Sequence, residues 1–232
     1  LASGLTVAFL LSGINAFHWL KNDRGLEVMA VLRTGLTIAA FLIPVQIVVG
    51  DMHGVNTLHH QPAKIAAMEG IWKTERGTAA VLFGILDAAT QSNKFEMGIP
   101  TLASFSLTHD WNGEVKGIDA FGDKHPPVAP VFYAFRIMVG VGLLMLAASW
   151  TGVWQLRRQG QPRPWLAKGL VAMTFIGWVG LIAGWYVTEI GRQPWLVQGV
   201  MTAAEAASTV PSAAIASTLV VYLLLYAVLI TA

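Results

Sequence analysis

Five long apolar stretches divide this chain, and they constrain its fold more than any other feature. They cover residues 1–20, 31–50, 130–154, 165–189 and 212–231. Each has about 20 residues or more, the length that an α-helix needs to cross the hydrocarbon core of a bilayer. Charged residues make up 12% of the chain, about half the share found in soluble domains. We therefore predict an all-α fold, a polytopic transmembrane helix bundle with about five spans.

The region between the second and third stretches has a different composition. Residues 51–129 contain most of the charged residues and five of the six histidines. This region is too long and too polar to be a simple connection, so we predict a large extramembrane loop. The expected organisation is two transmembrane helices in 1–50, the loop in 51–129 and three transmembrane helices in 130–232.

Two basic connections indicate the orientation in the membrane. Residues 21–33 and 157–168 are rich in Lys and Arg, and they fall on the same side when the spans alternate. Short basic connections accumulate on the cytoplasmic side. The loop at 51–129 and the turn at 192–195 are therefore expected together on the outer side.

Composition also excludes several classes of protein. The sequence has no cysteine, which excludes disulfides, thiolate-bound haem and iron–sulfur clusters on this chain. The net charge of +2 gives no reason to expect nucleic-acid binding. Leu1 lies inside an apolar run without a basic segment before it, so we recognise no signal peptide and expect a piece of a longer protein.

The first candidate site lies at the end of the fourth apolar stretch. Glu189 is an ionisable residue at membrane depth, which by default marks a functional site. Trp185 lies four residues earlier and shares its helix face. Gly191 and Pro194 end the helix and leave Arg192 in the cap region. These groups could hold a flat anionic cofactor, or they could form an interfacial ion pair among belt tryptophans; the residues alone leave both readings open.

The second candidate site lies at the start of the third stretch, where Arg136 and Met138 occur. As ordinary residues, Arg136 would extend to the interface and Met138 would pack in the bundle. Positions two apart on a helix lie about 200° apart. The two side chains therefore cannot both point at one ring, and Arg136 would reach only the edge of a cofactor or another partner.

The third candidate site is a short polar segment of the loop that contains Lys64 and Glu69. A carboxylate is suited to remove protons from a substrate that loses protons with its electrons. The alternative is a surface helix in which Glu69 pairs with Lys73 four residues later. We expect this segment to lie away from the spans, because it belongs to the polar loop.

The loop histidines give no comparable signal. His53, His59 and His60 form a cluster in the sequence, but their spacing matches no compact metal motif. We interpret them as loop histidines.

The three candidate sites together resemble a known family. The pattern Glu-x-Gly-Arg-Gln-Pro-Trp at 189–195, the Arg-x-Met at 136–138 and the segment at 61–74 resemble subunit I of the cytochrome bd-type quinol oxidases, and they occur in family order. The 66 residues between Glu69 and Arg136 resemble its short-loop, cyanide-insensitive-oxidase-like branch. The resemblance extends over the whole chain and implies a bacterial inner-membrane protein.

The resemblance also implies a role for each candidate residue. Glu189 would be the axial ligand of a high-spin haem b, with Trp185 and Arg192 near that cofactor. Met138 would be one axial ligand of a low-spin haem b, with Arg136 beside it. In the loop, Lys64 and Glu69 would act on quinol.

The implied activity is quinol oxidation at the outer face, with electrons passing through two b-type haems to a haem d or a third haem b. Dioxygen would be reduced to water there, and a membrane potential would form. The expected partners are quinol, dioxygen, membrane lipid, subunit II and a small accessory subunit, and no nucleic acid. Alternatives are a haem b electron-transfer subunit without oxygen chemistry and a cofactor-free transporter.

The resemblance finally implies that this chain does not turn over by itself. In the family a histidine shortly before the position of Leu1 completes the low-spin site, and the haem d ligand lies in an earlier span. His18 cannot substitute, because it lies about 20 Å or more along the helix, toward the opposite interface. We therefore expect these 232 residues to be the C-terminal part of subunit I.

Overall fold

The structure is a computed structural model that describes residues 1–231. The chain divides into two compact units, Leu1–Pro194 and Trp195–Ala232. All three candidate sites belong to the first unit.

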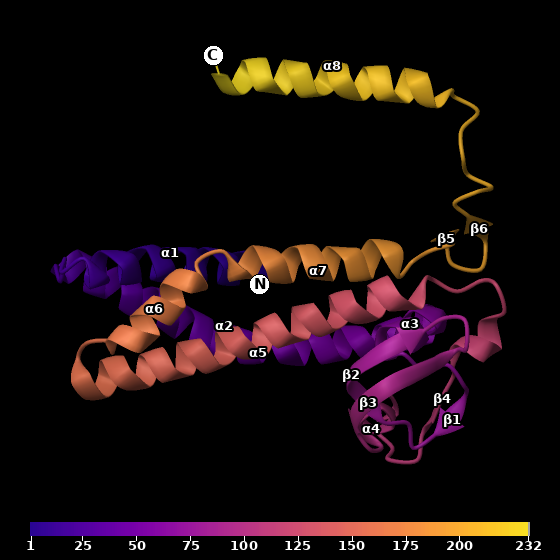
Figure 1. Ribbon diagram of the computed structural model, residues 1–232, viewed down its shortest axis with the longest axis horizontal. Helices are drawn as coiled ribbons and strands as arrows, with labels where there is room; N and C mark the ends of the chain where they lie inside the picture. The colour runs from indigo at the N-terminus through magenta and orange to yellow at the C-terminus, as the bar shows by residue number, and fades with distance from the viewer. Residues whose placement is uncertain (232) are drawn as a thin grey trace. The chain divides into compact units, whose positions relative to one another are not determined.

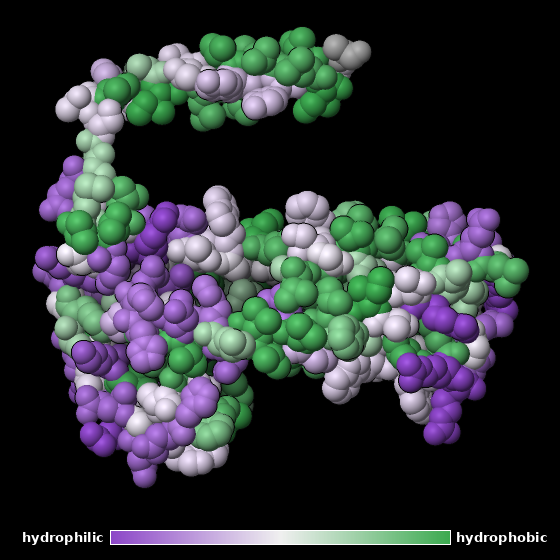
Figure 2. Space-filling model, turned by 180° about the vertical axis from the view of Figure 1, so that it is seen from behind, coloured by the Kyte–Doolittle hydropathy of each residue, from purple (hydrophilic) through white to green (hydrophobic). Residues whose placement is uncertain are grey.

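Long helices form the body of the first unit (Figure 1). They are α1 (Ala2–Leu20), α2 (Leu26–His60), α5 (Val128–Gln159), α6 (Pro164–Ala172) and α7 (Ile176–Ile190). In the face seen in Figure 2, hydrophobic residues form a band along these helices, and hydrophilic residues gather at both ends. Such a band fits the hydrocarbon core of a bilayer.

The number of candidate spans agrees with the prediction. Within residues 1–231, four helices are long and apolar enough to cross a membrane, namely α1, α2, α5 and α8 (Ser212–Thr231). The bent pair α6 and α7 makes a fifth if it is counted as one span, with an angle of 41° between its halves. The predicted all-α transmembrane bundle is confirmed.

The main core of the first unit lies between α1, α2, α5 and α6. Phe9, Leu32, Leu36 and Leu170 are at most 1% exposed in this core. Small residues let the helices approach closely, as is common between membrane helices. A Cβ on Gly152 of α5 would lie 2.7 Å from a methyl group of Leu36.

Glycines of α7 bring its backbone into close contact with α1 and α5, and the glycine at its C-terminal end contacts α3 (Pro62–Glu69). A Cβ on Gly177 would lie 2.7 Å from Thr6 of α1, and a Cβ on Gly180 would lie 3.1 Å from Val141 of α5. Gly184 and the capping Gly191 lie further along α7 and have equally close neighbours. Because Cβ contacts this short are rare, side chains larger than glycine are excluded or force a shift at these positions.

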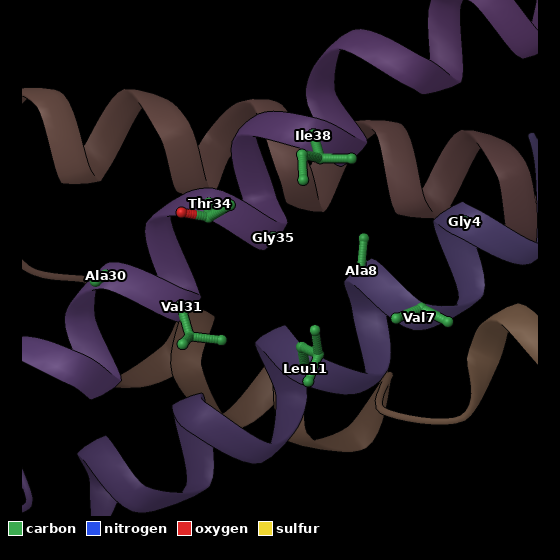
Figure 3. A pocket seen from close by; sticks show the side chains of 9 residues that line it. All are labelled: Gly4, Val7, Ala8, Leu11, Ala30, Val31, Thr34, Gly35 and Ile38. Atoms are coloured by element: carbon green, nitrogen blue, oxygen red, sulfur yellow. The ribbon is translucent and has the colours of Figure 1, made fainter.

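A cavity of about 330 Å³ lies between α1 and α2 (Figure 3). Its walls are mostly aliphatic, and small residues such as Gly4, Ala8 and Gly35 leave the space open. The cavity therefore follows from the same small residues that allow close packing elsewhere.

Helix α2 extends further than the sequence analysis predicted. It contains Pro44 and continues to His60, so that residues 51–60 of the predicted loop are helical. His53, His59 and His60 consequently lie on this extension. The helix ends at His60 and is capped by Gln61, because Pro62 disfavours the helical conformation of the residue that precedes it. Gln61 has a φ of −139° and a ψ of 62°.

The loop that follows contains short strands, which the expectation of an all-α fold did not include. A hairpin joins β2 (Ala80–Asp87) to β3 (Ser92–Ile99). Asp87 supports its turn by accepting hydrogen bonds from the backbone N–H groups of Ala89 and Thr90, as Asp commonly does in turns. Hydrogen bonds from Lys94 and Thr90 lower the pKa of Asp87 to about 2. The remaining elements are α3 (Pro62–Glu69), β1 (Glu75–Arg76), α4 (Leu102–Thr108), β4 (Glu114–Val115) and η1 (Ile118–Phe121).

A second small core fixes the loop to the beginning of α5. Ala66 and Ala67 of α3 and Val131 of α5 are fully buried in it. The Trp72 indole donates a hydrogen bond of 2.7 Å to Asn93, whose amide donates one of 3.1 Å to the Gly70 carbonyl. The loop is therefore a packed structure in contact with the spans.

The second unit is small. It contains the hairpin of β5 (Trp195–Val197) and β6 (Met201–Thr202), followed by α8. The hairpin occupies part of the connection predicted between the fourth and fifth spans.

Candidate functional site

Helix α3 connects the three candidate sites. It packs against α5, and the side chain of Lys64 on α3 reaches the end of α7. A Cβ on Gly191 would lie 3.0 Å from Lys64 Cγ and 3.2 Å from Cε. The expectation that Lys64 and Glu69 lie away from the spans is therefore wrong, because the loop core holds α3 against the ends of two of them.

Arg136 of α5 is bound to the loop by three hydrogen bonds. Its Nε donates to the Val81 carbonyl at 2.6 Å, and its two terminal nitrogens donate to the Met68 carbonyl at 2.9 Å and to Glu69 Oε2 at 3.0 Å. The guanidinium also lies over the Phe132 ring, 4.3 Å from its centroid. Arg136 is thus neither a free interfacial arginine nor directed to the same place as Met138.

The Glu69–Arg136 pair replaces the proposed pairing of Glu69 with Lys73. The side chains of Glu69 and Arg136 are 15% and 16% exposed. Burial raises the pKa of Glu69 above its ordinary value, and Arg136 opposes this effect by its charge and its hydrogen bond. A carboxyl group with a raised pKa is a better proton acceptor near neutral pH.

Glu189 and Arg192 form a second ion pair at the end of α7. An Arg192 terminal nitrogen donates to Glu189 Oε2 at 2.6 Å, and both side chains are about 40% exposed. The Nε of Arg192 is buried and has no hydrogen-bond partner within residues 1–231. Buried donors without a partner are rare in proteins, so this atom points to a missing acceptor.

Lys64 lies close enough to this pair to sense both charges. Its pKa is lowered by burial and by Arg192, whereas Glu189 raises it. Lys64 and Glu69 are five residues apart on α3, which corresponds to about 140° around a helix. They consequently face different partners, Lys64 toward α7 and Glu69 toward α5.

Met138 is half-buried and its sulfur faces α7. A Cβ on Gly184 would lie 3.0 Å from Met138 Sδ. Arg136 and Met138 thus diverge, one toward the loop and the other toward α7, as their spacing predicts. Trp185 is 61% exposed, and its ring lies 6.0 Å from that of Tyr186.

The donor atoms of this region fit haem. A methionine thioether and a carboxylate are suitable axial ligands for different kinds of iron site. Arg192 binds one oxygen of Glu189, and the other oxygen accepts no hydrogen bond within residues 1–231. The unpaired Nε of Arg192 fits a carboxylate on the edge of such a cofactor. Within residues 1–231, no three His, Asp or Glu side chains converge to hold a metal ion directly.

Comparison with known proteins identifies the family. The family model described as Cytochrome bd terminal oxidase subunit I matches residues 1–232. The chain belongs to this family. Haem cofactors and a membrane location are properties of the cytochrome bd family, and both agree with the spans and donor atoms described above.

Relatives of the cytochrome bd family match nearly the whole chain. Cytochrome bd ubiquinol oxidase subunit 1 of Bacillus subtilis (strain 168) is 32% identical over 223 residues, which cover 88% of this chain and 46% of the relative. Cytochrome bd-II ubiquinol oxidase subunit 1 of Escherichia coli (strain K12) is 27% identical and covers 100% of this chain and 58% of the relative.

A solved structure agrees with the same fold. The bd oxidase from Geobacillus thermodenitrificans superimposes with a TM-score of 0.82 at 31% identity, over 98% of this chain and 52% of that chain. The chain therefore spans about half the length of the cytochrome bd proteins that it matches.

Sequence reasoning missed the residues that join the three sites. Val81 and Met68 contribute only backbone carbonyls, which no side-chain pattern reveals. Gly184 and Gly191 matter because they lack a side chain. The available signal was the recurrence of glycine on one face of an apolar helix, which indicates close approach of another element.

Proposed function

We propose that this chain is the part of a terminal quinol oxidase subunit I that binds quinol and carries ligands of two b-type haems. The observation that carries the proposal is the position of α3. It places Glu69 against Arg136 on α5 and Lys64 against the end of α7. A group that acts on quinol thus lies beside the spans that contain Met138 and Glu189.

Glu69 is the proposed base. A quinol loses two protons with its two electrons, and a carboxyl group whose pKa is raised by burial can accept one of them. Arg136 positions Glu69 by one hydrogen bond and fixes the neighbouring backbone by two others. Lys64 is proposed to act on quinol as a cationic group from the other face of α3, where it lies against the end of α7.

Met138 and Glu189 are the proposed haem ligands in the spans. Met138 would bind the iron of a low-spin haem b, and Glu189 would bind that of a high-spin haem b. Arg192 would neutralise the Glu189 carboxylate and donate its buried Nε to an acidic group of the cofactor. When bound, the haems supply electron transfer and, with a haem d or a third haem b, the reduction of dioxygen to water.

The remaining proposals concern the complete enzyme. It would include subunit II and a small accessory subunit in a bacterial inner membrane. The loop that holds Glu69 would face the outer side, so that quinol protons are released there and a membrane potential forms.

The test uses the assembled oxidase with the full-length subunit. Glu69→Gln keeps the shape of the side chain and removes the base, so quinol-driven oxygen uptake should fall. Uptake with an artificial one-electron donor that bypasses quinol should persist. Arg76→Gln is the matched control, because Arg76 forms an exposed pair with Glu114 elsewhere in the loop. Equal loss with both donors would contradict the proposed role of Glu69.

A further inference from the structure

A second cavity of the first unit lies at the end of the helices away from α3. It has a volume of about 390 Å³ and lies between α2 and α5, lined by Arg33, Thr37, Val153, Leu156 and Arg157. This volume is in the range of pockets that hold small molecules. None of these residues belongs to the haem or quinol sites described above.

The crossing of α2 and α5 brings Arg33 and Arg157 to the same end of the helix bundle. The helices are in close contact where Gly152 of α5 meets Leu36 of α2, since a Cβ on Gly152 would lie 2.7 Å from a methyl group of Leu36. Arg33 precedes Leu36 by three residues and Arg157 follows Gly152 by five, which corresponds to about 4.5 and 7.5 Å along the helix axes. Because the helices run in opposite directions, both displacements point to the same end of the bundle. The two guanidinium groups therefore share one cavity.

An indole lies on the membrane side of this cavity. Trp150 of α5 donates a hydrogen bond of 3.1 Å from Nε1 to the carbonyl oxygen of Ala40 on α2. Trp150 is seven residues from Arg157, and Ala40 is seven residues from Arg33, so both lie about two turns deeper. The Trp150 side chain is 55% exposed. An apolar, accessible surface thus continues from the two cations toward the bilayer centre.

The two arginines have no counter-ion within the described part of the chain. None of the five ion pairs in residues 1–231 contains Arg33 or Arg157. The Thr37 hydroxyl donates to the Arg33 carbonyl at 2.7 Å, which fixes that turn of α2 without neutralising either charge. Both arginines are exposed, so water screens their mutual repulsion. An anion in the cavity would be attracted by both charges at once.

Phosphate is the anion that fits these groups and this location. Arginine binds phosphate oxygens through paired hydrogen bonds. The basic connections place this end of the bundle on the cytoplasmic side, where basic pockets between membrane helices bind anionic headgroups. We propose that the cavity binds the headgroup phosphate of an anionic phospholipid, with an acyl chain lying over Trp150. The proposal rests on the orientation of the chain and is independent of its activity on quinol.

The experiment measures lipid binding by the assembled oxidase with its full-length subunit. The complex is delipidated in detergent, titrated with phosphatidylglycerol and analysed by native mass spectrometry. Arg33→Gln combined with Arg157→Gln should weaken binding of one phosphatidylglycerol about 30-fold, from a factor of about five for each arginine near an anionic surface. The double variant with Lys at both positions should retain most of the affinity.

The matched control removes two charges from the same end of the bundle. Arg158 and Lys168 are exposed, as Arg33 and Arg157 are, but they do not line the cavity. Arg158→Gln with Lys168→Gln should therefore leave the affinity within twofold. Equal loss in both double variants would overturn the proposal, because binding would then follow the general surface charge. If the double variant does not assemble, Arg33→Gln and Arg157→Gln give the same comparison as single variants. Each should weaken phosphatidylglycerol binding about fivefold.

Two further arms identify the ligand. Phosphatidylcholine should bind at least tenfold more weakly than phosphatidylglycerol, and inorganic phosphate should not displace the lipid at equal concentration. Displacement by inorganic phosphate would assign the cavity to a free anion and overturn the lipid assignment. Absence of a bound phosphatidylglycerol in the wild-type complex would also overturn it and would indicate that another protein segment covers the cavity.

Discussion

Replacing Arg136 by Leu should release the loop between α2 and α5 from the membrane helices. The substitution removes the hydrogen bonds to Val81, Met68 and Glu69 in one step. It also leaves the Glu69 carboxylate buried without its counter-charge. Because Val81 belongs to β2 and Met68 to α3, a single side chain holds two loop elements against α5.

The expected magnitude follows from the burial of the pair. Both side chains are about 15% exposed, and removal of one partner from a buried ion pair costs about 3–5 kcal/mol. We expect the lower end, because Glu69 can escape by binding a proton. A loss of about 3 kcal/mol in the free energy of loop opening raises the open population about 100-fold.

Hydrogen–deuterium exchange of the assembled oxidase in lipid nanodiscs measures this opening. Peptides from residues 62–88 should exchange about 100-fold faster in Arg136→Leu than in the wild type, whereas peptides from α1 should not change. Arg76→Gln serves as the control, because exposed ion pairs contribute about 1 kcal/mol or less. Adding Glu69→Gln to Arg136→Leu should recover part of the protection, because a neutral amide costs less to bury than a carboxylate.

The pH dependence gives an independent check. Burial raises the pKa of Glu69 and Arg136 opposes this, so the variant's Glu69 should have a still higher pKa. A carboxyl group with a raised pKa in the folded state favours folding at low pH, and this contribution is lost as pH rises through that pKa. The ratio of the exchange rate in Arg136→Leu to that in the wild type, for peptides from residues 62–88, should therefore increase with pH. A ratio equal to that of the control at every pH would refute the anchoring role.

Three further predictions concern the proposed haem ligands. Met138→Leu should lower the free energy of unfolding by about 1.5 kcal/mol or less if Met138 only packs. If Met138 is a ligand, the substitution should convert the low-spin optical signal to high spin. An unchanged low-spin spectrum would reject the assignment. Gly184→Ala places a Cβ 3.0 Å from Met138 Sδ and should shift the potential of the low-spin haem in a redox titration, whereas Gly180→Ala, which meets only an aliphatic side chain, should not. Glu189→Ala should remove the high-spin haem b signal and preserve the low-spin signal, and full occupancy of both would show that Glu189 is not the ligand.

The spans could be predicted from the sequence because the length of each apolar stretch decides whether a helix can cross the bilayer. A helix of fixed rise must bury about 20 apolar residues to cross the bilayer, and the five stretches are read directly. The end of α7 at Ile190 was also predictable, since Gly191 and Pro194 disfavour a longer helix. The divergence of Arg136 and Met138 followed from helical geometry alone.

The contacts between the sites could not be predicted in the same way. Glu69 and Arg136 are 67 residues apart, and no local pattern relates them. The local alternative, a pair with Lys73, satisfied the helical spacing rule but required α3 to continue beyond Glu69. Gly70 instead adopts a left-handed conformation and ends the helix. The hairpin of β2 and β3 was missed because polar loop composition does not distinguish a folded loop from an irregular one.

The glycines along α7 make the two faces of this helix differ in how well they tolerate substitution. Gly177, Gly180 and Gly184 present bare backbone to α1 and α5, and any added atom there displaces a neighbour. Trp178 and Ile182 on the same helix are about half exposed and are free of that restriction. Substitutions on the face of α7 that carries Trp178 and Ile182 can therefore accumulate without changing the packing of the face that contacts Met138. A saturation mutagenesis scan of α7 scored by respiratory growth should divide along this line, with tolerated and lethal positions alternating at the helical period.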